Sequence, residues 1–347
     1  KSFKPGQEIP LYGPYRSLSE FYDGLKKEPN KINLNQFKSW GELLSLPSLP
    51  TEKSVKVFLK MRNQPSFNSP KHNWIAKPVR ELDQTNDLKK KDLMILDQNG
   101  RNNLLPAYTG KSFAPKDDIL NPDTGNYYCW VDNKTIKDYL QQKRLNSYKL
   151  HSSAHFGLSE QIIKDPSTLY INRPRIIFQD ITNSIDYKTI KAVLAPPNVV
   201  LTGTSPYLFT NYSAKHEAFL LGVLLSTPFD WLARRYVSNH VNFFILNYLP
   251  VPLVNFNETI ISEIQKLSGS LAAVDQRYSD WAKEVGVKVN SINSVDQKKE
   301  ILSNIDALVS YLYGLNEDDI KVIFQTFHHS WDYSEKLSKV LSYFRSI

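Results

Sequence analysis

The stretch Ala214–Pro252, AKHEAFLLGVLLSTPFDWLARRYVSNHVNFFILNYLPVP, sets the pattern of the whole chain. Its first half predicts an apolar helix and then a second helix, which begins with a proline and ends at Arg234 and Arg235. A polar link that contains His240 follows, and after it we expect a strand of aromatic and aliphatic residues that stops at the last prolines. This order predicts a buried scaffold that carries two guanidinium groups and one imidazole to a single edge.

Length, composition and charge describe a globular protein with an excess of positive charge. The chain has 347 residues, of which 41% are hydrophobic and 22% are charged. That length suffices for about two domains with their own cores. Lysine and arginine number 43 against 35 aspartate and glutamate residues, which gives a net charge of +8. The excess permits a polyanionic partner such as nucleic acid, because each neutralised phosphate releases counterions.

The single cysteine, Cys129, excludes an internal disulfide and any zinc site built on cysteines. It stands among aromatic residues, which favours a small buried thiol over a nucleophile. A reducing compartment suits such a chain, so we expect a cytoplasmic protein. No apolar run approaches the roughly 20 residues that a membrane span requires, and we expect no membrane partner.

A mixed β-sheet domain is predicted before the helical C-terminal part. Short aromatic strands alternate with glycine and proline turns over residues 104–130, and Asn121–Gly125 is the strongest of these turns. Helical spacing follows at Asn133–Leu145, with basic residues near its end as a helix C-terminus prefers. Leu169–Phe178 then has the composition of a strand. The Ala214 helix begins after these elements.

Beyond the last prolines of the opening stretch, the hydrophobic period becomes that of helices. Apolar residues step by four and three positions at Ile260, Ile264, Leu267, Leu271, Val274, Tyr278 and Trp281. The same spacing recurs over residues 301–312, and Gly314 follows as a helix stop. Asn316 with Asp319 has the pattern of a capped helix start, and Ser334 opens a last helix. The first seam either closes within this chain, which we expect, or docks a partner protein.

Three segments follow from these patterns. Residues 1–54 are interpreted as an arm that packs on a neighbouring domain, with a short helix around Trp40. The arm and the mixed sheet together make up residues 1–253. Residues 254–347 form a small helical bundle. The predicted fold class is therefore α+β, a mixed β-sheet domain followed by a C-terminal helical region.

Basic residues on these elements are candidates for binding phosphate groups or base edges. Arg173 and Arg175 lie two apart on the predicted strand, so their side chains leave the same face. A guanidinium forks onto phosphate or guanine, and an asparagine amide matches an adenine edge. A surface ladder of salt bridges, or helix capping, would use the same residues, so both interpretations stay open. The candidates for nucleic-acid contact are Arg173, Arg175, Arg234, Arg235, His240, Asn242, Lys188 and Lys111.

Enzymatic chemistry has weaker signals. Asp186 and Lys188 fit the carboxylate-x-lysine element of many nucleases, with Asp180 upstream as a candidate metal ligand. A metal-dependent nuclease is therefore one alternative function. His328 and His329 would point about 100° apart on a helix, so they cannot share a metal as residues four apart can. No glycine-rich phosphate loop and no serine- or zinc-hydrolase motif occurs, so we assign no catalytic residue and no metal site.

Six blocks of sequence follow one another in an order that is typical of one enzyme family. They are Leu105–Phe113 (LPAYTGKSF), Asn121–Trp130 (NPDTGNYYCW), Asn172–Thr182 (NRPRIIFQDIT), Asp230–Pro252, Leu271–Trp281 (LAAVDQRYSDW) and Leu312–Tyr333 (LYGLNEDDIKVIFQTFHHSWDY). With these blocks the chain resembles the C-terminal, target-recognition half of the Eco57I- and TaqI-like N6-adenine DNA methyltransferases, type II enzymes of restriction-modification systems. The similarity extends from Val55 to the C-terminus.

The resemblance implies a specificity region and not an autonomous catalyst. In that family, a Rossmann-like N-terminal domain binds S-adenosylmethionine and carries an Asn-Pro-Pro-Tyr-type motif that holds the flipped adenine. Here Asn121 and Pro122 form the one Asn-Pro pair, Asp123 follows them, and no glycine loop for S-adenosylmethionine occurs. We therefore expect no cofactor in this chain, and S-adenosylmethionine and methyl transfer in the N-terminal domain of a full-length parent. The arm of residues 1–54 would pack on that catalytic domain.

Partners and alternatives complete what the resemblance implies. The expected partners are double-stranded DNA, the N-terminal methyltransferase domain of the same protein, and other subunits of a restriction or phage-defence system. Residues 1–253 would read the DNA, and residues 254–347 would close the chain. Recognition loops diverge within the family, so the resemblance assigns no base to any residue. Besides the nuclease, the other alternative is a protein-interaction module of a defence complex, in which the helical seam docks a partner.

Overall fold

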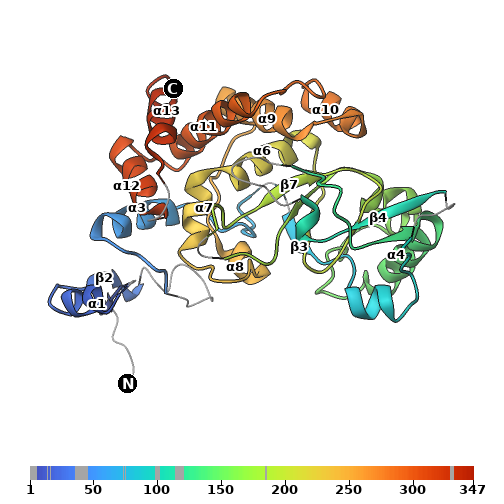
Figure 1. Ribbon diagram of the computed structural model, residues 1–347, viewed down its shortest axis with the longest axis horizontal. Helices are drawn as coiled ribbons and strands as arrows, with labels where there is room; N and C mark the ends of the chain where they lie inside the picture. Colours follow the sequence, from blue (N-terminus) through green and yellow to red (C-terminus); the bar gives the residue numbers. More distant parts are fainter. Residues whose placement is uncertain are drawn as a thin grey trace.

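The structure is a computed structural model. It describes residues 6–13, 15, 17–35, 46–72, 74, 76–97, 102–113, 121–183, 186–328 and 332–347. The short helix expected around Trp40 lies outside these residues, as does the second histidine of the pair His328-His329. Figure 1 shows sheets at the centre and right of the view, with the C-terminal helices along its top.

The described strands form three sheets. A two-stranded antiparallel sheet lies near the N-terminus, and a four-stranded sheet with the order β3-β9-β6-β7 is antiparallel throughout. The third sheet has the order β5-β4-β8, in which β4 pairs antiparallel with β5 and parallel with β8. The strands are β1 (Glu8–Leu11), β2 (Asn30–Asn33), β3 (Ala76–Val79), β4 (Leu104–Tyr108), β5 (Cys129–Asp132), β6 (Arg175–Phe178), β7 (Ala192–Ala195), β8 (Val200–Leu201) and β9 (Tyr207–Thr210).

Helices flank the sheets and make up the C-terminal part, which confirms the α+β fold class with its C-terminal helical region. The α-helices are α1 (Leu18–Leu25), α3 (Glu52–Arg62), α4 (Asn133–Ser147), α5 (Glu160–Lys164), α6 (Ala214–Leu225), α7 (Thr227–Arg234), α8 (Phe243–Tyr248), α9 (Thr259–Ala272), α10 (Ser279–Val285), α11 (Val295–Leu312), α12 (Glu317–Phe327) and α13 (Ser334–Phe344). Short helical turns are η1 (Gln84–Lys89), η2 (Gly110–Phe113), η3 (Pro166–Thr168), η4 (Tyr170–Asn172) and η5 (Gln276–Tyr278).

The helix α6 is the centre of the packing, as the apolar run that follows its polar first turn predicts. It contacts β7 on one side and α9, α10 and α11 on others, so nearly all of its residues are buried. A small residue, Gly222, lets α9 approach closely, because a Cβ built there would lie 2.6 Å from Cγ2 of Ile264. One turn further along α9, the Ser268 hydroxyl donates a hydrogen bond of 2.5 Å to the backbone oxygen of Ala218.

Buried carboxylates of α7 and α11 join α7 to its surroundings. Asp230 of α7 accepts hydrogen bonds from the backbone N–H groups of Thr189 (3.0 Å) and Ile190 (2.6 Å), just before β7. Asp306 of α11 accepts from the N–H (2.6 Å) and the hydroxyl (2.7 Å) of Thr227, at the start of α7. The opening stretch of sequence is therefore tied to both the sheet and the C-terminal helices.

The structure differs from the sequence prediction at three places. The expected strand after Asn242 is the helix α8, which buries Ile245, Leu246 and Tyr248 in the main hydrophobic cluster. The expected strand Leu169–Phe178 starts only at Arg175, because its first residues form short helical turns that end before Pro174. The prediction of one continuous helical seam is also wrong after Leu271. The helix α9 ends at Ala272, and the last seam residues lie on η5 and α10.

Several helix boundaries agree with the prediction. The helix α4 covers Asn133–Leu145, and α13 begins at Ser334. The side chains of Asn316 and Asp319 each accept from the other's backbone N–H, which is the predicted capping pattern. Gly314 has a φ of +70°, the left-handed conformation that a glycine helix stop requires. These are local signals, set within one turn of the chain.

One hydrophobic cluster spans both predicted domains. It contains buried residues of α3, β6, α6 and α7 together with residues of α9, α11, α12 and α13. The first part of the predicted seam, with Ile264 and Leu271, therefore packs inside this chain. The boundary between residues 253 and 254 stays a prediction. In the described ranges, no helix combines the length and apolarity needed to cross a lipid bilayer.

The substitution Gly222→Ala should destabilise the fold, because the added methyl group would meet Ile264 at 2.6 Å. We expect a loss of about 1–3 kcal/mol in the free energy of unfolding, which exceeds the gain in helix propensity. Urea denaturation followed by circular dichroism measures it. The control Gly203→Ala places its methyl 3.9 Å from the nearest atom and should leave stability unchanged. Equal stability of the two variants would contradict the close packing of α6 on α9.

Candidate functional site

Arg175, a predicted DNA contact, lies entirely inside the protein. Its side chain is 0% exposed and its Nη2 donates to the Glu81 carboxylate (3.1 Å) and to the Val199 carbonyl (2.8 Å). The same carboxylate accepts from the N–H of Leu201 at 2.7 Å. Burial raises the pKa of Glu81, while the charge of Arg175 acts in the opposite direction. The prediction that Arg175 binds DNA is wrong, because its guanidinium has no route to an external phosphate.

The other buried candidates are Arg234, Arg235 and Lys188, which bind backbone carbonyls. The Nη2 of Arg234 donates to the oxygen of Asp186 at 2.7 Å. Arg235 donates to Ser48 (3.3 Å) and Thr326 (3.1 Å), and burial lowers its pKa. Lys188 donates to the last carbonyl of α6. These three predicted contacts are also corrected, because their charges hold distant segments together inside the fold.

Arg173 does not share a strand face with Arg175, contrary to the prediction. It lies just before β6, with its side chain 38% exposed, and its Nη2 is 3.0 Å from the carboxylate of Glu217. Glu217 is a buried residue of α6 that also accepts from the Trp281 indole at 2.9 Å. Arg173 therefore compensates a buried negative charge, and the two arginines contact different elements.

Three predicted residues lie at the surface in one region. Lys111 is exposed on η2, and His240 is 51% exposed on an isolated bridge with Ile181. Asn242 is partly buried at the start of α8, two residues after His240. Ile181 and Lys111 line the same pocket, which brings Lys111 close to the segment of His240.

This pocket has a volume of about 590 Å³ and is formed where several loops meet. The loops follow β4 and β6, precede β5, connect β8 to β9 and begin η1. Among the residues that the structure describes, no carboxylate side chain lines it; amides, hydroxyls, two phenol rings and one ammonium group do. The lining residues are Gln84, Thr109, Gly110, Lys111, Asn126, Tyr127, Tyr128, Gln179, Ile181 and Thr204.

Internal hydrogen bonds hold the pocket walls. The Ser112 hydroxyl accepts from the N–H of Thr109 (2.9 Å) and donates to the carbonyl of Asn126 (2.6 Å). The Gln179 amide donates to the Gly110 carbonyl at 2.5 Å. A Cβ at Gly110 would lie 3.4 Å from the Gln179 side chain, which is an ordinary van der Waals contact. The loops from β4, β5 and β6 are therefore bonded to one another and not merely adjacent.

Tyr127 gives the pocket an aromatic wall. Its ring stacks on Tyr108, with centroids 5.6 Å apart and an angle of 14° between the planes. Its hydroxyl donates to Asp123 at 2.8 Å. Burial, followed by the hydrogen bond to this carboxylate, raises the pKa of Tyr127 to about 12, so the phenol is neutral at physiological pH.

A second cation, Arg80, extends the site beyond the pocket. Its side chain is 56% exposed, and its Nη2 is 3.1 Å from the carboxylate of Asp180. Asp180 donates its N–H to Thr204 (3.2 Å) and accepts at its backbone oxygen from Val241 (2.8 Å), and His240 Nδ1 lies 3.8 Å from its carboxylate. Arg80 and His240 thus flank the pocket on the side of Ile181. The sequence analysis did not select Arg80 as a candidate. The available signal was its position between Val79 and the buried Glu81, because side chains alternate along an extended segment and that of Arg80 therefore points to the opposite face.

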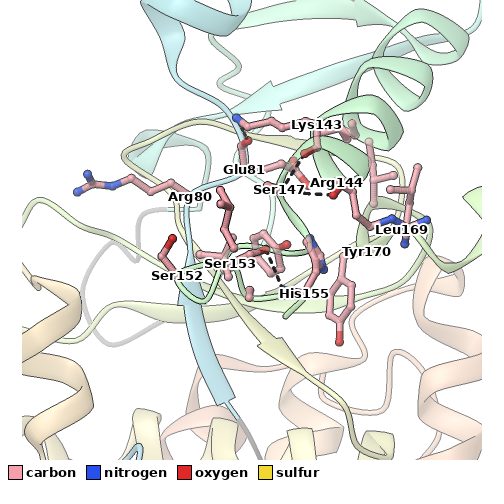
Figure 2. A pocket seen from close by; sticks show the side chains of 16 residues that line it. Arg80, Glu81, Lys143, Arg144, Ser147, Ser152, Ser153, His155, Leu169 and Tyr170 are labelled. Atoms are coloured by element: carbon pink, nitrogen blue, oxygen red, sulfur yellow. Dashed lines mark hydrogen bonds between the residues drawn. The ribbon is translucent and has the colours of Figure 1, made fainter. Parts of the chain in front are cut away.

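A smaller pocket of about 230 Å³ is lined by Arg80 and Glu81 together with residues of α4 and η4 (Figure 2). Lys143 donates there to the Glu81 carbonyl (2.8 Å) and to Asp87 (2.7 Å). Burial lowers the pKa of His155 to about 4, so its imidazole is neutral. Figure 2 shows Arg80 extending away from the other labelled side chains. Apart from Arg80, the charged groups Glu81, Lys143 and Arg144 of this pocket are committed to internal contacts, so we assign the pocket a structural role.

The nuclease alternative finds little support in the contacts of its residues. Asp180 contacts Arg80, Asp186 accepts from Lys191, and Lys188 donates to the end of α6. Lys188 and the candidate metal ligand Asp180 therefore have different partners. Within the described ranges, no group of three or more His, Cys, Asp or Glu side chains is placed to hold a metal ion.

Comparisons with known proteins found a limited likeness to solved structures. No protein family and no curated protein matches this sequence. Among solved structures, the chain is similar to the type IIL restriction-modification enzyme MmeI in complex with DNA, at 11% identity and a TM-score of 0.38. The match covers 82% of this chain and 37% of the other, so the chain spans little more than a third of that enzyme. A likeness at this level does not establish a common fold or function.

The substitution Arg175→Met should destabilise the protein strongly, because it leaves the Glu81 carboxylate buried without its cation. We expect a loss of about 3–5 kcal/mol in the free energy of unfolding, measured by urea denaturation near neutral pH. The double variant Glu81→Gln/Arg175→Met should recover part of it. As a control, Lys111→Ala changes an exposed side chain and should change stability by less than about 0.5 kcal/mol. A fully stable Arg175→Met protein would refute the structural role of this pair.

Proposed function

We propose that this chain binds double-stranded DNA through the pocket of about 590 Å³ and its rim. We call this surface the loop face and define it by Arg80, Lys111, Tyr127, Ile181 and His240. The observation that carries the proposal is a pocket whose described lining contains amides, hydroxyls and an ammonium group but no carboxylate, with exposed basic groups beside it. Lysine and arginine bind the phosphate backbone, while amide and hydroxyl groups recognise base edges.

The charges around the loop face agree with this proposal. Asp180 has a side chain only 9% exposed and contacts Arg80, so the cation is the more exposed member of the pair. Asp123, at 15%, contacts Arg277 and Tyr127. The turn η1 begins at Gln84 and ends at Lys89, and Lys89–Lys91 are exposed, as are Asp83 and Asp92 on either side. The exposed cations Arg80 and Lys111 beside the pocket would attract a polyanion.

We further propose that the chain is the specificity region of an N6-adenine DNA methyltransferase from a restriction-modification or phage-defence system. The placement of the resembling blocks supports this. Leu105–Phe113 contributes Lys111, Asn121–Trp130 contributes Tyr127, and Asn172–Thr182 contributes Gln179 and Ile181. Asp230–Pro252 adds His240 beside Ile181. Blocks far apart in sequence thus meet at one surface, where loops that vary between members would set the DNA sequence that is read.

In the parent protein, methyl transfer from S-adenosylmethionine would belong to the N-terminal domain. This chain would hold the duplex in register for that reaction, in which the target adenine is extruded from the helix. Its partners would be DNA, the catalytic domain and other restriction or defence subunits, in the cytoplasm. The arm of residues 1–54 is the segment proposed to pack on the catalytic domain.

Removal of both exposed cations, in the double variant Arg80→Gln/Lys111→Ala, should weaken DNA binding by at least about tenfold at moderate salt. If each contacts one phosphate, the slope of log affinity against log salt should fall by roughly two units, because each contact contributes about 0.9. Fluorescence anisotropy with a labelled duplex of mixed sequence measures both quantities. Glutamine at position 80 keeps a hydrogen-bond donor near Asp180.

A matched control is the double variant Lys26→Ala/Lys266→Ala, which removes two exposed lysines of α1 and α9. It lowers the net charge by the same amount, so it should change affinity only slightly. If the control and the loop-face variant lose affinity equally, binding follows net charge and the loop face is not the contact surface. If the unaltered chain binds no duplex, the proposed function is wrong.

A further inference from the structure

The C-terminal helical region reaches the loop face through Arg277, which lies on η5 between α9 and α10. Its Nη1 is 3.0 Å from the carboxylate of Asp123, across 154 positions of sequence. Its Nη2 and Nε are 2.8 and 3.1 Å from Asp275, which therefore orients the guanidinium. One arginine thus bridges two carboxylates, one in each predicted domain.

The position of Arg277 is fixed by its neighbour. Tyr278 is buried, and its hydroxyl donates to the carbonyl of Leu194 in β7 at 2.8 Å. Asp275 also caps η5 by accepting from the N–H of Arg277 at 2.8 Å. The turn that carries the guanidinium is therefore attached to an edge strand of the four-stranded sheet. A planar guanidinium that is held by carboxylates on two sides has little conformational freedom.

On the other side of this contact, Asp123 organises the turn that forms one wall of the pocket. Its carboxylate accepts from the N–H of Gly125 (3.0 Å) and from the Tyr127 hydroxyl (2.8 Å). The next residue, Thr124, donates its N–H to Ser112 (2.8 Å) and its hydroxyl to the carbonyl of Lys111 (2.9 Å). The turn therefore sets the positions of both Tyr127 and Lys111 in the pocket.

We propose that Arg277 is a positioning residue of the loop face: it holds the Asn121–Gly125 turn, and through it Tyr127 and Lys111, without touching DNA itself. The effect of Arg277 on DNA binding rests on the proposed function, whereas its effect on the turn rests on the contacts alone. By this link, the helical region contributes to the selection of DNA sequence, because it fixes an aromatic wall and a cation of the recognition pocket.

The first test measures amide hydrogen exchange in the full chain without DNA, comparing the unaltered protein with Arg277→Gln. We expect faster exchange confined to peptides that cover residues 121–128, whose amides bond within this turn and to Ser112 and Ala107. The matched control is Arg345→Gln, which removes another exposed arginine with a bidentate carboxylate partner, Glu317. Exchange in residues 121–128 that is unchanged by Arg277→Gln, or equally changed by Arg345→Gln, would overturn the proposal.

The second test measures duplex binding and sequence selection. Arg277→Gln should raise the Kd for a duplex recovered from a random pool by roughly fivefold, with an unchanged salt slope because no phosphate contact is lost. Arg277→Lys, which keeps the charge but loses the fork, should behave in the same way. Adding Asp123→Asn to Arg277→Gln should cost nothing more, because the two residues act as one unit.

Different results separate the two proposals. A lower salt slope in Arg277→Gln would mean that Arg277 contacts a phosphate directly, which overturns its positioning role. Additive losses in the double variant would do so as well. If the unaltered chain selects no duplex, the proposed function fails, while the exchange experiment still decides whether Arg277 holds the turn. Thermal unfolding of each variant shows whether a loss of affinity reflects a loss of the fold.

Discussion

The carboxylate of Glu81 binds the two larger sheets to each other, and the geometry of the loop face depends on this contact. It accepts from Arg175 at the start of β6 and from the N–H of Leu201 in β8, so it joins strands of different sheets. The same guanidinium also reaches the carbonyl of Val199. Both charges are buried, and neither could stay there without the other. The loops that follow β4, β6 and β8 end at a common place because these strands are held in this way.

Some of the lysine and arginine side chains of this protein act inside it. Arg234 and Arg235 end the helix α7, and their guanidinium groups bind carbonyls of segments far away in sequence. Lys188 does the same for the end of α6. A guanidinium can donate up to five hydrogen bonds, so it can satisfy several carbonyls where secondary structure ends. The surface charge available to a polyanion is therefore smaller than the composition suggests, and Arg80 and Lys111 are part of it.

The helical region supports the rest of the chain in two ways. It packs α9 and α11 against α6, where the absence of a side chain at Gly222 sets the distance between helices. It also extends Arg277 to the Asn121–Gly125 turn, outside the hydrophobic core. The first contact stabilises the scaffold, and the second acts on a single recognition loop. A region with no residue in the pocket lining can therefore determine how the pocket is shaped.

The sequence by itself determined the elements whose signals are local. The apolar run of α6, the capped start of α12 and the glycine stop at Gly314 follow from residues within one turn of each other, and the α+β class follows from the order of such elements. Lys111, His240 and Asn242 were chosen from local composition, and their contact with DNA stays a prediction. The resemblance to target-recognition regions and the DNA-binding function remain proposals.

Only the tertiary structure decided which cations face solvent. Arg173 and Arg175 have the same residue type two positions apart, yet one pairs with Glu217 of α6 and the other with Glu81. The local pattern does not predict that Arg175 pairs with a carboxylate 94 positions away, because these partners meet only after the sheets assemble. Packing likewise made the segment after Asn242 a helix and brought five loops into one pocket. Burial depends on contacts between residues distant in sequence. The set of charged and polar groups that stay exposed at the surface therefore depends on the same contacts.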